Sequence, residues 1–476
     1  MTARTLAALA ALAGFTLAAG CATPGDVGPR AKPIDPAALQ ASRTLAATPG
    51  ARGAWPVDQW WSQFGDAQLD ALVGEALGSS PSMRLARARV DRALALARVA
   101  GAEGDPRLDA SFSTQRQRIT EHGIFPPPIA GAWIWQNQAM LNFSYDFDFW
   151  GRHEAAHDAA LGQARAAAAD AQAARLVLES AICATYVQLA DRYEQLDLMR
   201  EELALRERQA AIVERRTDAG LESRVELNQA EGAIPEARQR IVQAEESIAL
   251  ARNQLAALLG QGPDRGLQIA RPALKAGAAP ALPAELPANL LGRRPDIVAS
   301  RWRVEAAAED VAGARAAFYP NINLAASFGL QAITWSEFLD PGSTAFAVGP
   351  AISLPIFDGG RLRGELGVKS ADYDAAAEQY NQALADALRE VADQVAAWRS
   401  IERQQPLVES TLASAETAHD YALSRYRAGL TNYVTVLSTE SQLTAARSRA
   451  ADLRTRRLEA AIGLARALGG GYQEGS

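Results

Sequence analysis

The chain has 476 residues, 48% of them hydrophobic, a formal net charge of -7 and only two cysteines. Charges of both signs are spread along the chain rather than gathered in a basic stripe, which argues against nucleic acid as a partner. Two cysteines exclude a disulfide framework, so we expect Cys183 to be a small buried apolar residue.

The N-terminus has the features of an export signal. Arg4 precedes an apolar run over residues 6–19, which has the length of a signal peptide and is too short for a helix that spans a membrane. The run ends in small residues directly before Cys21, as in lipoproteins. We expect residues 1–20 to be a signal peptide, Cys21 to be lipidated and residues 21–65 to form a lipid-anchored leader. A cleaved signal with an incidental cysteine is the alternative.

An internal duplication organises the rest of the chain. Pro81 to Pro106 align with Pro295 to Pro320 at an offset of 214 residues, and from Arg152 onward the offset is 209. The change of offset falls within one segment, which is expected to carry loops because loops tolerate insertions. The expected parts are a first repeat (66–260), a linker (261–287), a second repeat (288–469) and a tail (470–476).

Each repeat contains a candidate β-hairpin, at about 107–150 and about 320–357. Apolar and polar residues alternate from Leu141 to Phe149, from Ile322 to Leu330 and from Phe346 to Ile356, which is the period of a strand with one apolar face. Each run has the length of a tilted strand that crosses a bilayer. The alternative is a half-buried sheet of a soluble protein. Four strands cannot close a transmembrane barrel, so a membrane role would require several copies of the chain.

Long helices are predicted after each hairpin. Residues 152–217 and 361–427 contain a single proline, Pro406, and are rich in Ala, Leu, Glu, Gln and Arg. Each would be roughly 100 Å long if it were straight. Gly220 and Gly429 end these helices, and return helices are expected over residues 225–259 and 434–468. The glycine run Gly469 to Gly471 is expected to stop the last helix and begin a flexible tail.

One motif suggests chemistry of a different kind. His153-Glu154-Ala155-Ala156-His157 matches H-E-x-x-H, in which two histidines one helical turn apart bind zinc and the glutamate activates water. Its duplicated counterpart, Leu362 to Leu366, has none of these side chains except a glutamate at another position. The sequence also lacks a phosphate-binding glycine loop and a nucleophile elbow. We therefore expect no enzyme, no metal site and no cofactor, with a zinc peptidase as the rival interpretation.

Four segments resemble the TolC-like outer-membrane factors, specifically the lipoprotein (NodT-type) branch that serves tripartite RND efflux systems. They are Arg293-Arg294-Pro295-Asp296-Ile297, Ala316 to Asn321, Leu354 to Arg361 and Arg425 to Leu430. The resemblance implies a mainly α protein with a small β part. It implies a homotrimer with a 12-strand outer-membrane β-barrel continued by a 12-helix periplasmic α-barrel, and an inner-membrane RND-type pump as partner.

The same resemblance assigns roles to residues at the helical tips. Gly220, Leu221, Gly429 and Leu430 would dock on a periplasmic adaptor protein. The residues expected at a periplasmic gate are Tyr426, Arg427, Val434, Ser438 and Glu226. Ser438 stands where the family often has Asp, so closure by a ring of carboxylates is left open, with Glu226 and Glu440 as other sources of charge. Glycines that only terminate helices are the alternative for the tips.

The predicted function is a passive exit duct for drugs, other toxic small molecules or metal ions. A related duct for type I polypeptide secretion and a periplasmic coiled-coil scaffold are the alternatives. The lipidated cysteine favours the first over the second, and the amphipathic strand hairpins argue against the third.

Overall fold

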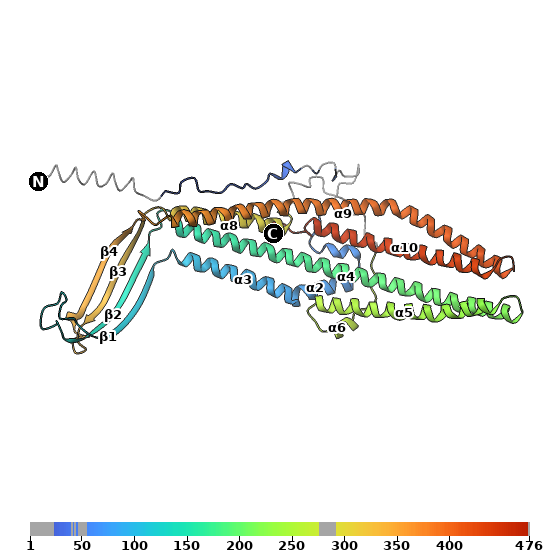
Figure 1. Cartoon of the computed structure of the whole chain (residues 1–476), viewed down its shortest axis with the longest axis horizontal. Helices are drawn as coiled ribbons and strands as arrows, with labels where there is room; N and C mark the ends of the chain where they lie inside the picture. Colours follow the sequence, from blue (N-terminus) through green and yellow to red (C-terminus); the bar gives the residue numbers. More distant parts are fainter. Residues whose placement is uncertain (1–22, 40, 42–43, 46–54, 276–291, 475–476) are drawn as a thin grey trace. The chain divides into compact units, whose positions relative to one another are not determined.

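The computed structural model describes residues 23–39, 41, 44–45, 55–275 and 292–474 (Figure 1). Cys21, the expected signal peptide and residues 276–287 of the expected linker lie outside these residues. The chain forms two compact units, and each takes segments from both sequence repeats. The first combines Val90–Ala167 and Ser300–Tyr380 with the leader through Pro33, and the second combines Ile34–Arg89, Ala168–Ala299 and Asn381–Ser476.

A four-stranded antiparallel sheet belongs to the first unit. Its strands follow the order β1-β2-β3-β4, with the bounds Arg107–Arg118, Trp133–Asp146, Asn321–Ala332 and Thr344–Ser353. The register pairs Leu141 with Phe328 and Phe328 with Phe346, and it pairs Phe143 with Ala326. The alternating apolar residues of both hairpins therefore share one face of the sheet, as the period of two predicts.

The first hairpin ends earlier than its alternation predicts. The apolar pattern continues through Phe149, but β2 ends at Asp146 because Asp148 has a positive φ of 44° and leaves the extended conformation. The Asp148 carboxylate instead accepts hydrogen bonds from the backbone N–H groups of Arg152, His153 and Glu154, at 2.6 to 3.0 Å. These are donors of the first turn of the next helix, so Asp148 caps that helix rather than extending the strand.

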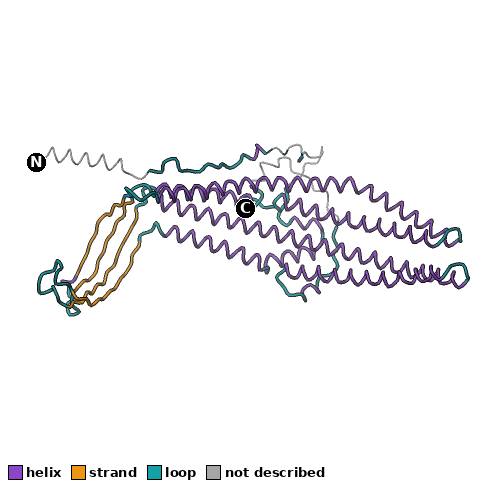
Figure 2. The backbone as a smooth tube through the Cα atoms, in the orientation of Figure 1, coloured by secondary structure: helices purple, strands orange, loops and turns teal. Residues whose placement is uncertain are grey.

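The long helices match their predicted bounds to within one residue. Helices α4 (Arg152–Asp218) and α9 (Arg361–Arg427) have 67 residues each, and α9 continues through Pro406. The return helices are α5 (Arg224–Leu258) and α10 (Tyr433–Ala467), so the two helical hairpins are equivalent (Figure 2). The shorter helices that precede the hairpins or connect the repeats are α2 (Ala67–Ser79), α3 (Pro81–Ala102), α6 (Asp264–Leu267) and α8 (Pro295–Ala316).

The apolar core of the second unit joins α2, α4, α5 and α10. Ile182, Tyr186 and Leu255 are fully buried in it, and Cys183 is buried as expected. Burial raises the pKa of the Cys183 thiol, which keeps it protonated and unreactive. The Tyr186 hydroxyl donates to Asp66 Oδ2 at 2.8 Å, and Asp66 in turn caps α2 by accepting from the N–H of Gln68. The buried Tyr186 hydroxyl is therefore paired.

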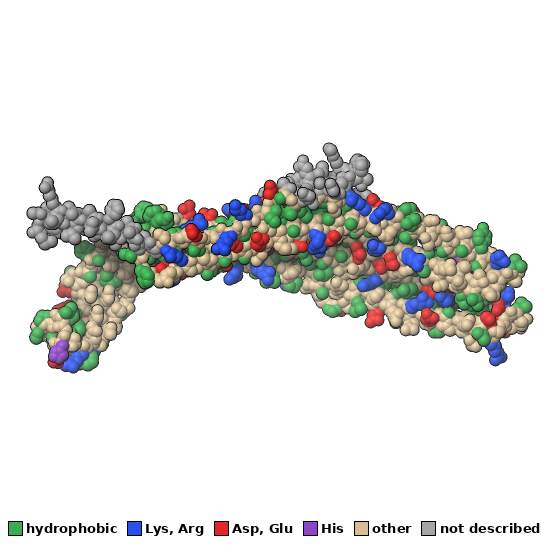
Figure 3. Space-filling model, turned by 45° about the horizontal axis from the view of Figure 1, so that its top comes forward, with side chains coloured by type: hydrophobic (Ala, Val, Ile, Leu, Met, Phe, Trp, Pro, Cys, Tyr) green, Lys and Arg blue, Asp and Glu red, His purple; other side chains and the backbone are tan. Residues whose placement is uncertain are grey.

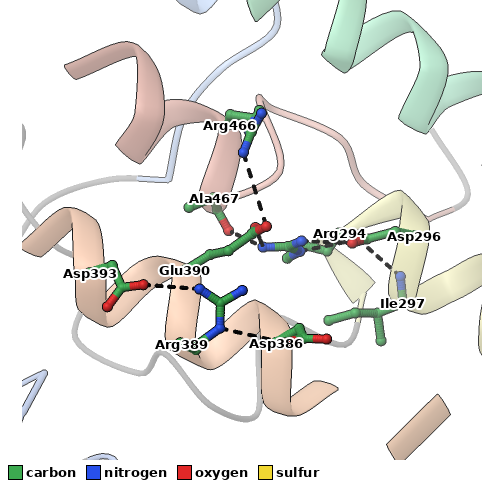
Figure 4. Close-up of polar contacts among 9 residues, drawn as sticks. All are labelled: Arg294, Asp296, Ile297, Asp386, Arg389, Glu390, Asp393, Arg466 and Ala467. Atoms are coloured by element: carbon green, nitrogen blue, oxygen red, sulfur yellow. Dashed lines mark hydrogen bonds and ion pairs between the residues drawn. The ribbon is translucent and has the colours of Figure 1, made fainter. Parts of the chain in front are cut away.

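The Arg-Pro-Asp segment forms a junction of three helices in the second unit. The Arg294 side chain lies before the first turn of α8, where its Nη2 contacts Asp296 Oδ2 at 2.6 Å and its Nη1 contacts Glu390 Oε2 of α9 at 2.8 Å (Figure 4). Nη1 also donates to the carbonyl oxygen of Ala467 at the end of α10, at 3.1 Å. Arg294 is buried, so this one side chain joins the start of α8 to α9 and α10.

The glycine run after α10 stops the helix, and its backbone lies directly against two other segments. Gly469, Gly470 and Gly471 all have positive φ, between 58° and 89°. A Cβ at Gly469 would overlap the backbone of Arg293, and a Cβ at Gly471 would overlap the backbone of Val57. Only residues without a side chain fit here, because two other segments pass directly against the run.

The leader lies along α9. Val27 packs beside Leu362 and Leu366 of the first unit, and Arg363 Nε donates to the carbonyl oxygen of Thr23 at 2.8 Å. One oxygen of Asp374 accepts from the backbone N–H groups of Arg30 and Ala31, at 2.7 and 2.8 Å. The extended segment thus gains from α9 the hydrogen bonds that it cannot make within itself.

Candidate functional site at the helical tips

The two helical hairpins turn at glycines, as predicted. Gly220 and Gly429 have φ of +73° and +74°, a conformation that glycine adopts without strain. The N–H of Leu221 bonds to the carbonyl oxygen of Arg216, and the N–H of Leu430 bonds to that of Arg425. These are the bonds of a Schellman motif, in which the chain turns outward after a helix. Leu221 and Leu430 are 66% and 67% exposed.

Each return helix begins at a capping side chain that follows the turn. Ser223 accepts from the N–H of Val225 at 3.1 Å, and Glu226 reaches back to the N–H of Ser223 at 3.1 Å, which completes a capping box. The hydrogen bond from the Ser223 side chain lowers the pKa of Glu226. In the second copy, Asn432 accepts from the N–H of Thr435 at 3.1 Å. In both tips, the end of the first helix and the start of the return helix are therefore capped by hydrogen bonds.

Tyr426 lies between the two hairpins rather than at the surface. It is buried together with Val213 and Tyr433, and the rings of Tyr426 and Tyr433 are 5.7 Å apart. The guanidinium of Arg216 lies 4.7 Å from the Tyr426 ring, and both side chains bond to Glu222 Oε1, at 3.2 Å from Arg216 Nε and 3.4 Å from the Tyr426 hydroxyl. Burial, and secondarily the charge of Glu222, raises the pKa of Tyr426 to about 12. This cluster joins the tip of one repeat to the tip of the other.

The other residues predicted at the gate do not gather around Tyr426. Arg427, Val434 and Ser438 are exposed on the protomer, and Glu226 is engaged in its capping box. In a single chain the predicted set thus divides into a buried tyrosine, a capping glutamate and three exposed side chains. The predicted gate residues therefore do not form one cluster within a protomer.

A buried charge cluster joins α4, α5 and α10 further along the hairpins from the tips. Glu202 Oε1 contacts Arg206 Nη2 at 2.7 Å and Arg240 Nη2 at 3.0 Å. Glu440, which is 1% exposed, lies 3.9 Å from Arg206, and burial raises the pKa of its carboxyl. The sequence analysis noted Glu440 but missed its partners. The spacing of four between Glu202 and Arg206 on one helix is the signal that could have found the first pair.

The H-E-x-x-H segment has another role in the structure. His153 Nε2 lies 3.1 Å from Asp146 Oδ2, and the N–H groups of His153 and Glu154 are held by Asp148. Among the described residues, no group of three His, Cys, Asp or Glu side chains is placed to hold a metal ion. The segment forms the capped first turn of α4, which explains its polar residues without catalysis.

None of the helices in the described part of the chain combines the length and the apolar character that crossing a membrane requires.

A duplicated hairpin of strands followed by a long helical hairpin, with one apolar sheet face and two glycine-turned tips, defines the protomer of a channel-forming outer-membrane protein. The chain belongs to the outer membrane efflux protein family, whose model matches residues 72–261 and 286–470. It is an efflux channel protein of the TolC-like type and not an enzyme.

Three relatives illustrate the match. The chain is 41% identical over 367 residues to the fusaric acid resistance protein FusA of Burkholderia cepacia, covering 76% of this chain and 69% of that protein. It is 32% identical to the pyoverdine export outer membrane protein OpmQ of Pseudomonas aeruginosa, covering 96% and 97%. The crystal structure of VceC from Vibrio cholerae superposes with a TM-score of 0.83 at 38% identity, covering 88% of this chain and 100% of that one.

Proposed function

We propose that this chain is the exit duct of a tripartite pump and that three copies form it, with twelve strands in a barrel and twelve helices in a periplasmic tunnel. The observation that carries the proposal is the open sheet. Strands β1 and β4 lie at its two edges, and neither pairs with a further strand among the described residues. An open edge cannot face lipid, because no water is present to bond its backbone groups. Pairing β1 of one copy with β4 of the next removes both edges, and three copies give twelve strands.

The two faces of the sheet suit a barrel wall. Exposed apolar side chains cover one face, among them Leu108, Phe328, Phe346 and Val348. The opposite face of β1 carries only polar or charged residues, from Arg107 and Asp109 to Gln117. A barrel built this way presents apolar residues to lipid and a polar lining to water.

The leader supports a lipid anchor at Cys21. Thr23 is held by Arg363 in the first turn of α9, and that helix follows β4 after a short connection. A lipid on a residue two positions earlier would therefore start close to the end of the sheet. Loss of labelling by radioactive palmitate in Cys21→Ser tests this anchor, and unchanged labelling would contradict it.

The helical tips are proposed to receive a periplasmic adaptor that is itself coupled to an inner-membrane pump of the RND type. Leu221 and Leu430 are exposed apolar side chains next to turns whose backbone is fixed by two hydrogen bonds each, which makes them preformed anchors. Adaptor docking would bias the exposed Arg427, Val434 and Ser438 between a closed and an open arrangement.

The cargo is proposed to be small toxic organic compounds. FusA is named for resistance to fusaric acid and OpmQ for export of pyoverdine, and other relatives are named multidrug resistance proteins. A water-filled duct need only admit such molecules.

Deletion of the gene tests the function directly. We expect greater susceptibility to several small organic toxins and unchanged secretion of polypeptides, together with heat-modifiable trimers of the intact chain in outer-membrane fractions. Unchanged susceptibility combined with a lost secreted polypeptide would favour the type I duct instead.

A further inference from the structure

The free end of the strands carries basic side chains on the apolar face of the sheet. The register pairs Arg116 with Trp135 and Arg118 with Trp133. Both arginines are an even number of residues from Leu108 and Phe112, so they point to the same face as these exposed apolar residues. Figure 3 shows basic and hydrophobic side chains together at this end of the strands.

This face changes in character along β1. Leu108, Ala110 and Phe112 are followed on the same face by Thr114, Arg116 and Arg118. The change begins at Thr114, whose hydroxyl donates to Asn137 Oδ1 across the strands at 2.7 Å. The apolar band therefore ends at this pair, and the residues beyond it are cationic.

Aromatic rings surround the cationic end. Trp335, in the connection between β3 and β4, lies 6.4 Å from Phe112 and 6.3 Å from Trp135. Phe338 of the same connection lies 6.1 Å from Phe112. The connection thus packs onto the apolar face, where Asn137 is fully buried. Tryptophan is the residue that favours the interface between a bilayer and water.

The guanidinium of Arg116 is held by rings rather than by a carboxylate. It lies 5.7 Å from the ring of Trp133 and 5.8 Å from that of Trp135. Within the described part of the chain it makes no ion pair. Arg118 contacts Glu121 at 2.7 Å, but both side chains are more than half exposed, so the pair is weak and open to exchange. Stacking fixes the plane of a guanidinium and leaves its donors free, which suits recognition of phosphate.

Position along the strand also indicates an interface. Eight residues separate Leu108 from Arg116, which is about 26 Å along a strand and about 20 Å of height at the usual tilt. A lipid-facing arginine costs about 2–4 kcal/mol at the middle of a bilayer and about 0–1 kcal/mol near its surface. Arg116 and Arg118 are therefore tolerated at the level of the lipid headgroups, at the end of the sheet remote from the helices.

We propose that Arg116 and Arg118, flanked by Trp133 and Trp135, bind the phosphate groups of an anionic phosphorylated lipid in the outer leaflet. The inference rests on the proposed barrel, which turns this face to lipid and this end outward. Two neighbouring cations supply charge-assisted hydrogen bonds to phosphate, and the tryptophans contact the region where the acyl chains begin. A trimer has one such site per chain.

The test measures retention of bisphosphorylated lipid A on the purified full-length trimer by native mass spectrometry. The double variant Arg116→Gln with Arg118→Gln is expected to retain about tenfold less lipid A than the wild type, as loss of charged hydrogen bonds predicts. Arg107→Gln is the matched control, because Arg107 lies on the same strand and pairs with Ser144 on the opposite face. It is expected to retain lipid A like the wild type.

Further arms separate the explanations. Arg116→Lys keeps the positive charge but loses the paired donors of the guanidinium, so intermediate retention of lipid A is expected. This variant replaces the double variant if the double variant fails to assemble. Equal retention by the wild type and the variants, equal retention of a neutral lipid, or displacement by inorganic phosphate at low concentration would each overturn the inference. A monomeric wild type in the same spectra would instead overturn the proposed barrel, and this inference with it.

Discussion

Side chains at the end of α9 and the start of α10 differ sharply in their surroundings. Tyr426 is buried between the hairpins and bonded to Glu222, whereas Arg427 one position later is exposed. Neighbouring residues on a helix point about 100° apart, so one turn both fastens the two repeats together and presents a charge outward. Tyr426 is suited to hold the tips, and Arg427 is suited to act at an opening between copies.

Arg427→Ala is expected to raise the single-channel conductance in planar bilayers. In the proposed duct, removal of a long exposed side chain widens the aperture at the tips. Arg425→Ala is the matched control, because it removes the same charge two positions away on a different side of the helix. Conductance that rises equally in both variants, or in neither, would contradict a specific role for Arg427.

Glu440→Gln is expected to raise the melting temperature at neutral pH by a few degrees. Burial raises the pKa of Glu440 above its ordinary value of 4.5, so the folded chain holds this proton more tightly than the unfolded chain does. The group therefore favours the fold at low pH and loses that effect as pH rises through the raised pKa. The difference between variant and wild type should shrink as pH falls towards 4.5. A difference independent of pH would show that Glu440 acts by packing alone.

At the scale of helices, Arg294→Met is expected to destabilise the second unit by about 2–4 kcal/mol. The substitution leaves Glu390 and the Ala467 carbonyl without a buried partner. Arg389→Met, next to Glu390 in α9, is the control, because the pairs of Arg389 with Asp386 and Asp393 are exposed (Figure 4). It should change stability by less than about 0.5 kcal/mol. Thermal unfolding followed by circular dichroism compares the two variants. Equal losses of stability in both would contradict the role of Arg294 in joining the three helices.

The leader offers a second prediction at this scale. Asp374→Ala is expected to speed tryptic cleavage after Arg30 by about tenfold, because it removes two charge-assisted hydrogen bonds to the backbone at that site. Asp374→Asn keeps an acceptor oxygen and is expected to slow cleavage again. Mass spectrometry of the released peptide gives the rates. Cleavage equally slow in wild type and Asp374→Ala would mean that the hydrogen bonds of Asp374 do not hold the leader.

Local patterns predicted the elements well. The helix bounds followed from composition and the scarcity of proline, the apolar face of the hairpins followed from periodicity, and the turns at Gly220 and Gly429 followed from turn chemistry. Contacts between segments that are distant in the sequence could not be predicted from these local patterns. The close approach of Arg293 to Gly469 depends on where two segments distant in the sequence meet, and the stacking of Arg216 on Tyr426 depends on how the end of α4 packs beside the end of α9. The end of β2 was predicted too late, because the alternating strand pattern continues past Asp146. Asp148 has a stronger preference to cap a helix than to extend a strand.

At the scale of the whole molecule, one chain supplies a sheet with two open edges and two helical hairpins with equivalent tips. Its family is that of outer-membrane efflux channels, and TolC-like channels function as homotrimers in tripartite efflux systems. Closure of the proposed barrel is the step on which the rest of the proposal depends, because the proposed polar lining, aperture and lipid-facing arginines all require the edges to be paired between copies.

The most direct measurement of that closure is disulfide cross-linking between the edge strands. Cysteines introduced singly along β1 are combined with cysteines along β4 in the full-length chain in membranes. We predict that pairs in register join copies into covalent trimers, which run at three times the protomer mass on denaturing gels without reductant. Cysteine pairs that yield only cross-links within one chain, or ladders without a stop at three copies, would contradict the account.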